Sequence, residues 1–313
     1  SLYSNGQYQE AIDAIKLLNQ SYPNVPLLFN LIGACYKELG QLKGAAKMFE
    51  VAINLKPDYA ECHKNLGITL REIGHLEDSA ETLKRAIEVN PSYVDAYYNL
   101  ALLLIKQNEI DNAITKLNHA LTLKPNHTQA HYQVGQQYLN QNNYQQAIEH
   151  LDHCLQQNPN NAEFNHLMGL ALYQDGQHEG AIHYLEQTLI HDPKHPEANH
   201  NLANAHLKLK NPEIALNYFF KQLEITPFFE SYYNIGVLLT YQERQRDAAQ
   251  YLLQASEMKP DDLDTQLNLG NLYLKLLNYE KAIHHYQKAQ TLSPNDAEIN
   301  HILQAISQSD NPD

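Results

Sequence analysis

Apolar and small residues recur along this chain at the spacing of one buried face of an α-helix. Counted from three residues after a proline, they fall at positions four, seven, eight and eleven of each unit, which lie on one side of a helix. In the third unit these positions hold Tyr97, Leu100, Ala101 and Leu104, and in the eighth they hold Gln266, Leu269, Gly270 and Tyr273. The pattern predicts an amphipathic helix in the first half of each unit.

Prolines mark the repeat of this pattern. They stand at Pro23, Pro57, Pro91, Pro125, Pro159, Pro193, Pro227, Pro260 and Pro294. Seven of the eight intervals are 34 residues, and the interval between Pro227 and Pro260 is 33. A period of this length predicts a stack of two-helix units in which each unit touches mainly its neighbours. The extended curved surface of such an array suits binding better than catalysis.

The unit that ends at Pro91 illustrates the predicted helix pair. It has one helix at residues 60–73 and another at residues 76–89, and Gly74 between them supplies a left-handed turn. The same slot holds Gly40, Asn108, Asn142 and Gly176 in other units. Asparagine is acceptable there because it also visits the left-handed conformation.

Two further expectations concern the ends of helices. The turn slot holds Lys210, Glu243 and Leu277 in the remaining units, so we expect those turns to be tighter or differently shaped. Pro26 and Pro196 are expected to open helices, because the first helical position needs no amide donor.

Two positions of the unit are always small. Position eight holds Gly33, Gly67, Ala101, Gly135, Gly169, Ala203, Gly236 and Gly270. Position twenty holds Ala45, Ser79, Ala113, Ala147, Ala181, Ala215, Ala248 and Ala282. Small residues at fixed places in both helices predict that the two backbones approach closely there, where a larger side chain would overpack the crossing.

These features resemble the tetratricopeptide repeat (TPR) family over nearly the whole chain. The resemblance implies an all-α fold, a right-handed superhelical solenoid of antiparallel helix pairs. We expect a half repeat at residues 1–25, eight units over residues 26–296, a capping helix at residues 297–307 and a disordered tail at residues 308–313. The units start near residues 26, 60, 94, 128, 162, 196, 229 and 263.

One departure from the family concerns position four, which is usually aromatic. Phe29, Tyr97 and Tyr232 keep the aromatic. The other units hold His63, His131, Asn165, Asn199 and Gln266. The expectation is that these polar residues loosen individual interfaces without changing the fold.

Charge and cysteine content narrow the classes of function. The net charge of −14 opposes binding to a phosphate backbone, so nucleic acid is not an expected partner. Cys35, Cys62 and Cys154 are odd in number and occupy slots for small residues, which predicts free thiols in a reducing compartment. No apolar run is long enough to span a bilayer. A cytoplasmic location is the expectation, although the sequence begins at Ser1 and leaves open a leader or a domain upstream.

The side of the first helix opposite the buried face carries a set of amide side chains, here called the carboxamide column. It consists of position six in six of the eight units: Asn65, Asn99, Gln133, Asn201, Asn234 and Asn268. A carboxamide can both donate to and accept from a peptide backbone, whatever side chains that peptide carries. The column therefore predicts binding of an extended polypeptide. The alternative is that asparagine at this slot is simply the family consensus.

The column resembles that of the repeat region in O-GlcNAc transferases and their plant and bacterial relatives, which bind extended polypeptides. Position five adds rings to the same predicted groove: Tyr98, Tyr132, His166, His200 and Tyr233. Position two carries Glu61, Asp95, Glu163, Glu197, Glu230 and Asp264, which either complement the helix dipole or select a basic partner. The carboxylate clamp of chaperone-binding relatives is not expected, because Gln129 and Gln133 stand in its slots.

The shortened interval coincides with an aromatic cluster. Phe219, Phe220, Phe228 and Phe229 are four of the seven phenylalanines in the chain. These rings either fill an altered junction between two units or, at Phe228 and Phe229, form an exposed apolar patch that docks a partner or a second copy of the chain.

No catalytic, cofactor or metal site is expected. His178 and Glu179 resemble the start of a zinc-protease motif, but His183 follows His178 by five residues where the motif requires four. The sequence has no glycine-rich phosphate loop and no CxxC pair. The predicted function is a protein-binding scaffold. The alternatives are the recruiting arm of a larger glycosyltransferase or sulfotransferase, and a scaffold that self-assembles through its ends.

Overall fold

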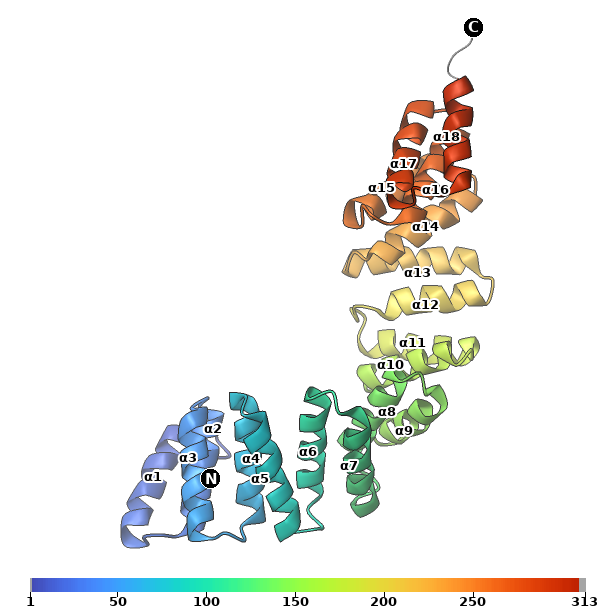
Figure 1. The fold of residues 1–313 in the computed structure, drawn as a ribbon. Coiled ribbons are helices and arrows are strands. Elements are labelled where there is room, and N and C mark those ends of the chain that lie inside the picture. The colour runs from blue at the N-terminus through green and yellow to red at the C-terminus, as the bar shows by residue number, and fades with distance from the viewer. Residues whose placement is uncertain (1, 310–313) are drawn as a thin grey trace. The chain divides into compact units, whose positions relative to one another are not determined.

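The computed structural model of the protein describes residues 2–309, and within them it has eighteen α-helices and no strand (Figure 1). The chain divides into two compact units, Ser1–Gln157 and Asn158–Asp313. The first contains α1 Tyr8–Ser21, α2 Pro26–Glu38, α3 Leu42–Leu55, α4 Ala60–Ile73, α5 Leu76–Val89, α6 Val94–Lys106, α7 Ile110–Leu123, α8 Thr128–Asn140 and α9 Tyr144–Gln157. The second contains α10 Ala162–Gln174, α11 His178–His191, α12 Ala198–Lys208, α13 Pro212–Ile225, α14 Phe229–Tyr241, α15 Gln245–Met258, α16 Leu263–Lys275, α17 Tyr279–Leu292 and α18 Ala297–Ser309.

Each unit is a solenoid of stacked helix pairs, which confirms the predicted fold class. A helix packs chiefly against the helices before and after it in the chain, and it makes smaller contacts with the next helix but one, as α4 does with α6. The helices predicted at residues 60–73 and 76–89 are α4 and α5. None of the described helices is both long enough and apolar enough to cross a membrane. The tail expected at residues 308–313 lies, from residue 310 onward, outside the described residues.

The small residues at position eight allow the two helices of a repeat to interlock. In each glycine-containing repeat, the Cα at this position faces a large side chain sixteen residues later. A Cβ built on Gly67 would lie 2.6 Å from Cγ of Leu83, and one built on Gly270 would lie 2.9 Å from the Tyr286 ring. The position-twenty residues are all fully buried, as predicted. Close backbone approach is therefore built into every pair.

In all eight repeats, the turn between the two helices has a residue with left-handed backbone at the same repeat position. Gly74 has φ of 103°, and Lys210, Glu243 and Leu277 have φ of 60°, 60° and 57°. The expectation that these last three turns would be tighter or differently shaped is therefore wrong. The packed helices on both sides of the turn hold it in one conformation. This packing offsets the conformational energy that a positive φ costs a residue with a Cβ.

Replacing Leu277 with glycine is expected to stabilise the chain by about 0.5–1 kcal/mol. A left-handed conformation costs a residue with a Cβ about 1–2 kcal/mol, which exceeds the extra unfolded-state entropy of glycine. Leu277 is 72% exposed, so the variant loses little packing. Urea denaturation followed by circular dichroism measures the change. Leu17, a leucine inside α1 that is 65% exposed, is the control, because glycine there should destabilise the helix.

Four of the five polar residues at position four bond to the proline that precedes their repeat. His63 Nε2 lies 2.8 Å from the carbonyl oxygen of Pro57, and Asn165 Nδ2 donates to that of Pro159 at 2.8 Å. The same bond joins His131 to Pro125, Gln266 to Pro260 and Asn300 to Pro294. The proline carbonyl follows the end of the second helix and would otherwise lack a partner. These side chains therefore join successive repeats, where loosening was expected.

Two further expectations have different outcomes. Pro26 is the first residue of α2, as predicted, but α12 begins at Ala198 and not at Pro196. Pro196 and Glu197 form a turn, which lengthens the link that follows α11. The three cysteines are buried and free, which confirms the absence of a disulfide.

Candidate peptide-binding face

The carboxamide column lies on the first helix of each repeat, half-buried in both units. In the unit Ser1–Gln157, α4, α6 and α8 carry Asn65, Asn99 and Gln133. In the unit Asn158–Asp313, α12, α14 and α16 carry Asn201, Asn234 and Asn268. Helical spacing places these side chains opposite the buried stripe, because position six is about 150° around the helix from the mean of positions four, seven, eight and eleven.

Three members of the column bond to the preceding repeat at the same offset. Asn65 Nδ2 donates to Asn30 Oδ1 at 3.0 Å, and Asn268 Nδ2 donates to the hydroxyl of Tyr233 at 3.2 Å. Asn201 Nδ2 lies 3.0 Å from His166 Nε2. In each case the partner is 35 residues earlier, at position five of the preceding repeat. The column therefore bonds across repeat boundaries as well as facing outward.

The amide groups keep capacity for a ligand. Asn99 Nδ2 donates to the Asp95 carbonyl at 2.8 Å, and Asn268 Nδ2 also donates to the Asp264 carbonyl at 2.9 Å. All of these bonds use the amide nitrogen, and a carboxamide has a separate acceptor oxygen. The bonds fix the orientation of each side chain and do not consume Oδ1. A bound peptide N–H could donate to these oxygens.

The tyrosines of position five are half-buried beside the column. Tyr98 lies against the His127 ring, with 5.2 Å between centroids. Burial is the main cause that raises the pKa of both Tyr98 and Tyr233, so each hydroxyl is protonated at neutral pH. Tyr132 is half-buried as well. Such rings offer apolar contact area together with a hydroxyl that can donate or accept.

The two histidines of position five are engaged within the protein. His200 Nδ1 lies 3.2 Å from Ser231 Oγ, and Asn204 Nδ2 lies 2.8 Å from His200 Nε2. Both ring nitrogens of His200 are thus used at the junction of α12 and α14. His166 is buried, with 5% of its surface exposed, and burial together with nearby His195 lowers the pKa of its imidazole to about 4. The two rings therefore pack and form hydrogen bonds within the protein and are not free to bind a peptide.

Two hollows include a member of the column. One of about 500 Å³ lies between α14 and α16 and is lined by Asn268, Tyr241, Val237 and Lys275. The other, of about 280 Å³, lies beside α2 and α4 and includes Asn65. Tyr241 is 82% exposed at the first of them. Each unit therefore offers a concave place at which a predicted groove residue meets solvent.

The aromatic cluster at the shortened interval packs within the chain. Phe219 is fully buried, while Phe228 and Phe229 are half-buried. Phe228 lies edge-on to the His200 ring at 5.8 Å, and the Nζ of Lys259 lies 4.1 Å above the Phe229 ring. This arrangement is consistent with filling of the junction. The docking patch at Phe228 and Phe229 stays a prediction.

One residue near the face lies outside every predicted set. His195 stands in the link between α11 and α12, buried, with its ring centroid 4.2 Å from that of His166. It is 29 residues after His166, so no short motif contains both. Tyr59 and His127 stand at the same repeat position and contact position five of their own repeats, so comparison of the repeats could have indicated this contact.

A stack of two-helix repeats is typical of a class of interaction proteins, and comparison with known families agrees. Models of the tetratricopeptide repeat match residues 28–59, 135–176, 172–234, 229–262 and 264–296, together more than half of the chain. A model of anaphase-promoting complex (cyclosome) subunit 3 matches residues 72–154. The chain belongs to the tetratricopeptide repeat family.

Individual relatives are more distant. A segment of 91 residues is 32% identical to the UDP-N-acetylglucosamine–peptide N-acetylglucosaminyltransferase of Giardia intestinalis, and it covers 29% of this chain but only 6% of that enzyme. The structure of YrrB, described as a TPR protein with an unusual peptide-binding site, is 21% identical with a TM-score of 0.57, over 63% of this chain and 99% of YrrB. MamA from Desulfovibrio magneticus RS-1 is 23% identical with a TM-score of 0.51, over 53% of this chain and 94% of MamA. These two structures show the shared fold.

Proposed function

We propose that the protein is an interaction scaffold that binds an extended polypeptide segment of another protein along its carboxamide column. The single observation that carries the proposal is the repeated 35-residue bond, which holds Asn65, Asn201 and Asn268 in fixed orientations. Preorganised amides bind a backbone with less loss of side-chain entropy than mobile ones. The column would contact peptide N–H and C=O groups, and Tyr98, Tyr132 and Tyr233 would contact side chains.

If the column binds a peptide backbone, binding should depend on the N–H groups of the peptide. No such dependence is expected if the asparagines are only the family consensus. A peptide selected from a randomised library on the purified chain would be resynthesised with alternate backbone amides methylated, and separately with its side chains permuted. Methylation removes N–H donors and is expected to abolish binding, while permutation is expected to weaken it only modestly. Fluorescence anisotropy measures both affinities. Equal tolerance of methylation and permutation would contradict the proposal.

Replacing Asn201, Asn234 and Asn268 together with alanine is expected to weaken peptide binding about 100-fold. Each neutral hydrogen bond contributes about 1 kcal/mol, and three such losses correspond to about two orders of magnitude in Kd. The matched control is the triple alanine variant of Asn54, Asn118 and Asn217, which are exposed on second helices. Circular dichroism shows whether each variant keeps its helices. Unchanged affinity in the folded column variant argues against the proposal.

A second candidate function rests on the match to the Giardia transferase. The matched segment would then be part of an arm that recruits polypeptide substrates to a catalytic domain elsewhere in a longer protein. The reading frame on both sides of this sequence decides between the two, since a transferase domain in the same frame would make the scaffold a substrate-recruiting arm.

A further inference from the structure

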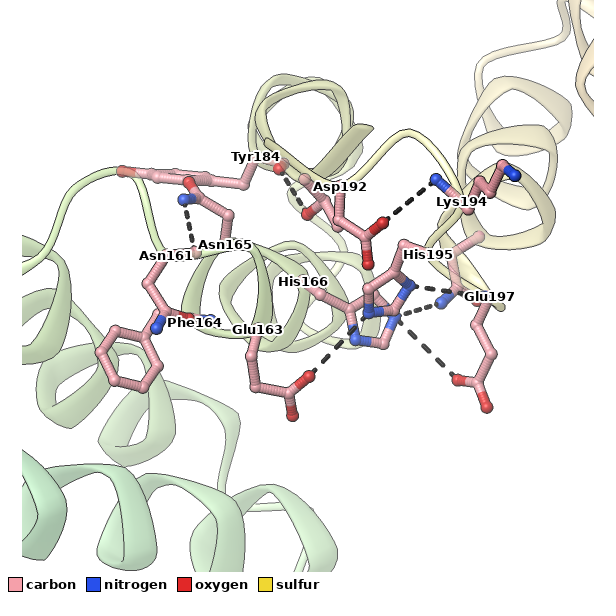
Figure 2. Close-up of polar contacts among 12 residues, drawn as sticks. Asn161, Glu163, Phe164, Asn165, His166, Tyr184, Asp192, Lys194, His195 and Glu197 are labelled. Atoms are coloured by element: carbon pink, nitrogen blue, oxygen red, sulfur yellow. Dashed lines mark hydrogen bonds and ion pairs between the residues drawn. The ribbon is translucent and has the colours of Figure 1, made fainter. Parts of the chain in front are cut away.

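Three potential metal ligands converge at one point of the unit Asn158–Asp313. Glu163 and His166 lie on α10, and His195 lies in the link between α11 and α12 (Figure 2). One ligand atom from each of the three lies within 4.8 Å of the other two. The same repeat geometry places Tyr59 against Asn30 and His127 against Tyr98, each also 29 residues apart.

The distances define a compact site. His195 Nε2 lies 3.9 Å from Glu163 Oε2, and His166 Nε2 lies 4.0 Å from Glu197 Oε2. The two imidazole rings have 4.2 Å between centroids, and the two carboxylates reach them from opposite sides (Figure 2). A tetrahedral zinc ion has ligand atoms about 3.4 Å apart, given bonds of about 2.1 Å. A small rotation of the exposed Glu163 side chain would bring its oxygen to that spacing from His195 Nε2.

The chemistry of these side chains suits a metal of the zinc type. Imidazole nitrogen with carboxylate oxygen is a ligand set for zinc and neighbouring first-row metals, whereas magnesium and calcium take oxygen ligands. His166 and His195 are 5% and 7% exposed, so both rings are held by packing.

Surrounding residues hold the rings in place. His166 Nε2 lies 3.0 Å from Asn201 Nδ2, and His195 Nδ1 lies 3.4 Å from the backbone nitrogen of Glu197. An ion would take the other nitrogen of each ring, and the imidazole proton would then sit on the nitrogen that faces its neighbour. Asn201 would turn its amide so that Oδ1 accepts from His166, which is the kind of outer contact that orients ligands in known metal sites. The site lies at a repeat boundary, because Glu163 and His166 are on α10 of the fifth repeat and His195 is in the link to α12 of the sixth.

We propose that Glu163, His166 and His195 bind a Zn²⁺ ion, with water as the fourth ligand. The inference does not rest on peptide binding by the carboxamide column. A bound ion would tie α10 to the link before α12 and would stiffen the boundary between the fifth and sixth repeats.

The test uses the whole chain, freed of metal with a chelator and titrated with Zn²⁺ in a calorimeter. We expect saturable binding and a rise in Tm, because a ligand that binds the folded state stabilises it. Titration with Co²⁺ should give the visible absorption of a tetrahedral complex, while Mg²⁺ and Ca²⁺ should leave Tm unchanged. Absence of saturable Zn²⁺ binding would overturn the proposal.

Variants assign the site. Glu163→Gln and His195→Gln are each expected to lower Zn²⁺ affinity at least about 100-fold, since changes outside the ligand shell alone cost about 10–100-fold. Glu163 is exposed, so its variant keeps the fold even if His195→Gln does not. His183→Gln, at an exposed histidine of α11, is the control and should bind as the native chain does.

A second histidine cluster could bind Zn²⁺ in place of the proposed site, and the same variants distinguish the two. His131 and His150 approach to 2.9 Å between their Nδ1 atoms in the other unit, with the His153 ring stacked on His131 at 4.3 Å. If Zn²⁺ affinity falls in His150→Gln and is unchanged in both Glu163→Gln and His195→Gln, the ion binds there and the proposed site is wrong.

Discussion

Replacing Gly236 with valine is expected to lower the free energy of unfolding of the unit Asn158–Asp313 by about 3 kcal/mol. A Cβ at this position would lie 2.5 Å from Cγ of Leu252 and 3.2 Å from its backbone nitrogen. A side chain can change rotamer, but a backbone atom moves only if the whole helix moves. Valine would therefore force α14 and α15 apart along a crossing whose facing residues, Ala248 and Leu252, are fully buried.

The matched control for this variant is Gly180→Val on α11. A Cβ there meets nothing nearer than Leu172 Cδ1 at 3.5 Å, which is an ordinary contact. The control is expected to change stability by less than about 1 kcal/mol. Urea denaturation followed by circular dichroism compares the two, and the midpoint is the safer quantity because repeat arrays need not unfold in one step. Similar midpoints for the two variants would show that the crossing can widen at little cost.

Acidification from pH 6.5 to pH 4 is expected to destabilise both units. Burial lowers the pKa of His150, His166 and His285 to about 4 each, against an ordinary value near 6.5 in an unfolded chain. Between these values the unfolded chain binds protons that the folded chain does not, so stability falls as pH falls and the loss levels off below pH 4. Each ring contributes on the order of 1–2 kcal/mol, after allowing for the solvent that reaches it.

The neighbours of these rings explain why they stay neutral. After burial, the largest effects on His150 come from His131 and His153, and those on His285 come from His284 and two lysines. His285 Nδ1 also bonds to the buried Oε1 of Gln266 at 2.8 Å. A proton added to either ring would therefore enter a buried place next to other cationic groups.

The variant His150→Gln/His285→Gln isolates this effect, because glutamine can still donate a hydrogen bond but does not titrate. Its stability should depend less on pH between 6.5 and 4 than that of the native chain, in metal-free buffer. His183→Gln should leave the pH profile unchanged. Thermal melts across this range give the comparison, and parallel profiles for all three proteins would mean that other groups control acid unfolding.

Much of the fold could be predicted because the same pattern of apolar residues, small residues and prolines occurs in eight units. The proline period and the buried stripe predicted α4 and α5 with their observed ends. The turns at Lys210, Glu243 and Leu277 could not be predicted from those residues, because their own preferences oppose a positive φ. Packing between the two helices decides that conformation, and it becomes visible only when all repeats are compared in three dimensions.

The helical positions of the carboxamide column could be predicted from the sequence, but the hydrogen bonds of its side chains could not. Helical spacing placed Asn65 and Asn268 opposite the buried stripe, and the structure has both side chains half-buried. Their place in a peptide-binding groove stays a prediction. Their bonds to Asn30 and Tyr233 depend on the register between neighbouring repeats, which the sequence of one repeat does not contain. His195 was missed because its contact with His166 joins a helix to the link at the far end of the same repeat, which helical spacing does not relate, although Tyr98 and His127 make the same contact.

The bond from position four to the preceding proline changes where one repeat should be said to begin. A gene duplication or an engineered deletion cut just after Pro159 would separate the Pro159 carbonyl from its donor Asn165 and leave a new neighbour to replace it. A cut in the turn at Gly176 would keep donor and acceptor on the same piece. The unit that keeps this bond intact therefore runs from one left-handed turn to the next. Repeat arrays joined at those turns should fold in a new order more readily than arrays joined at the prolines.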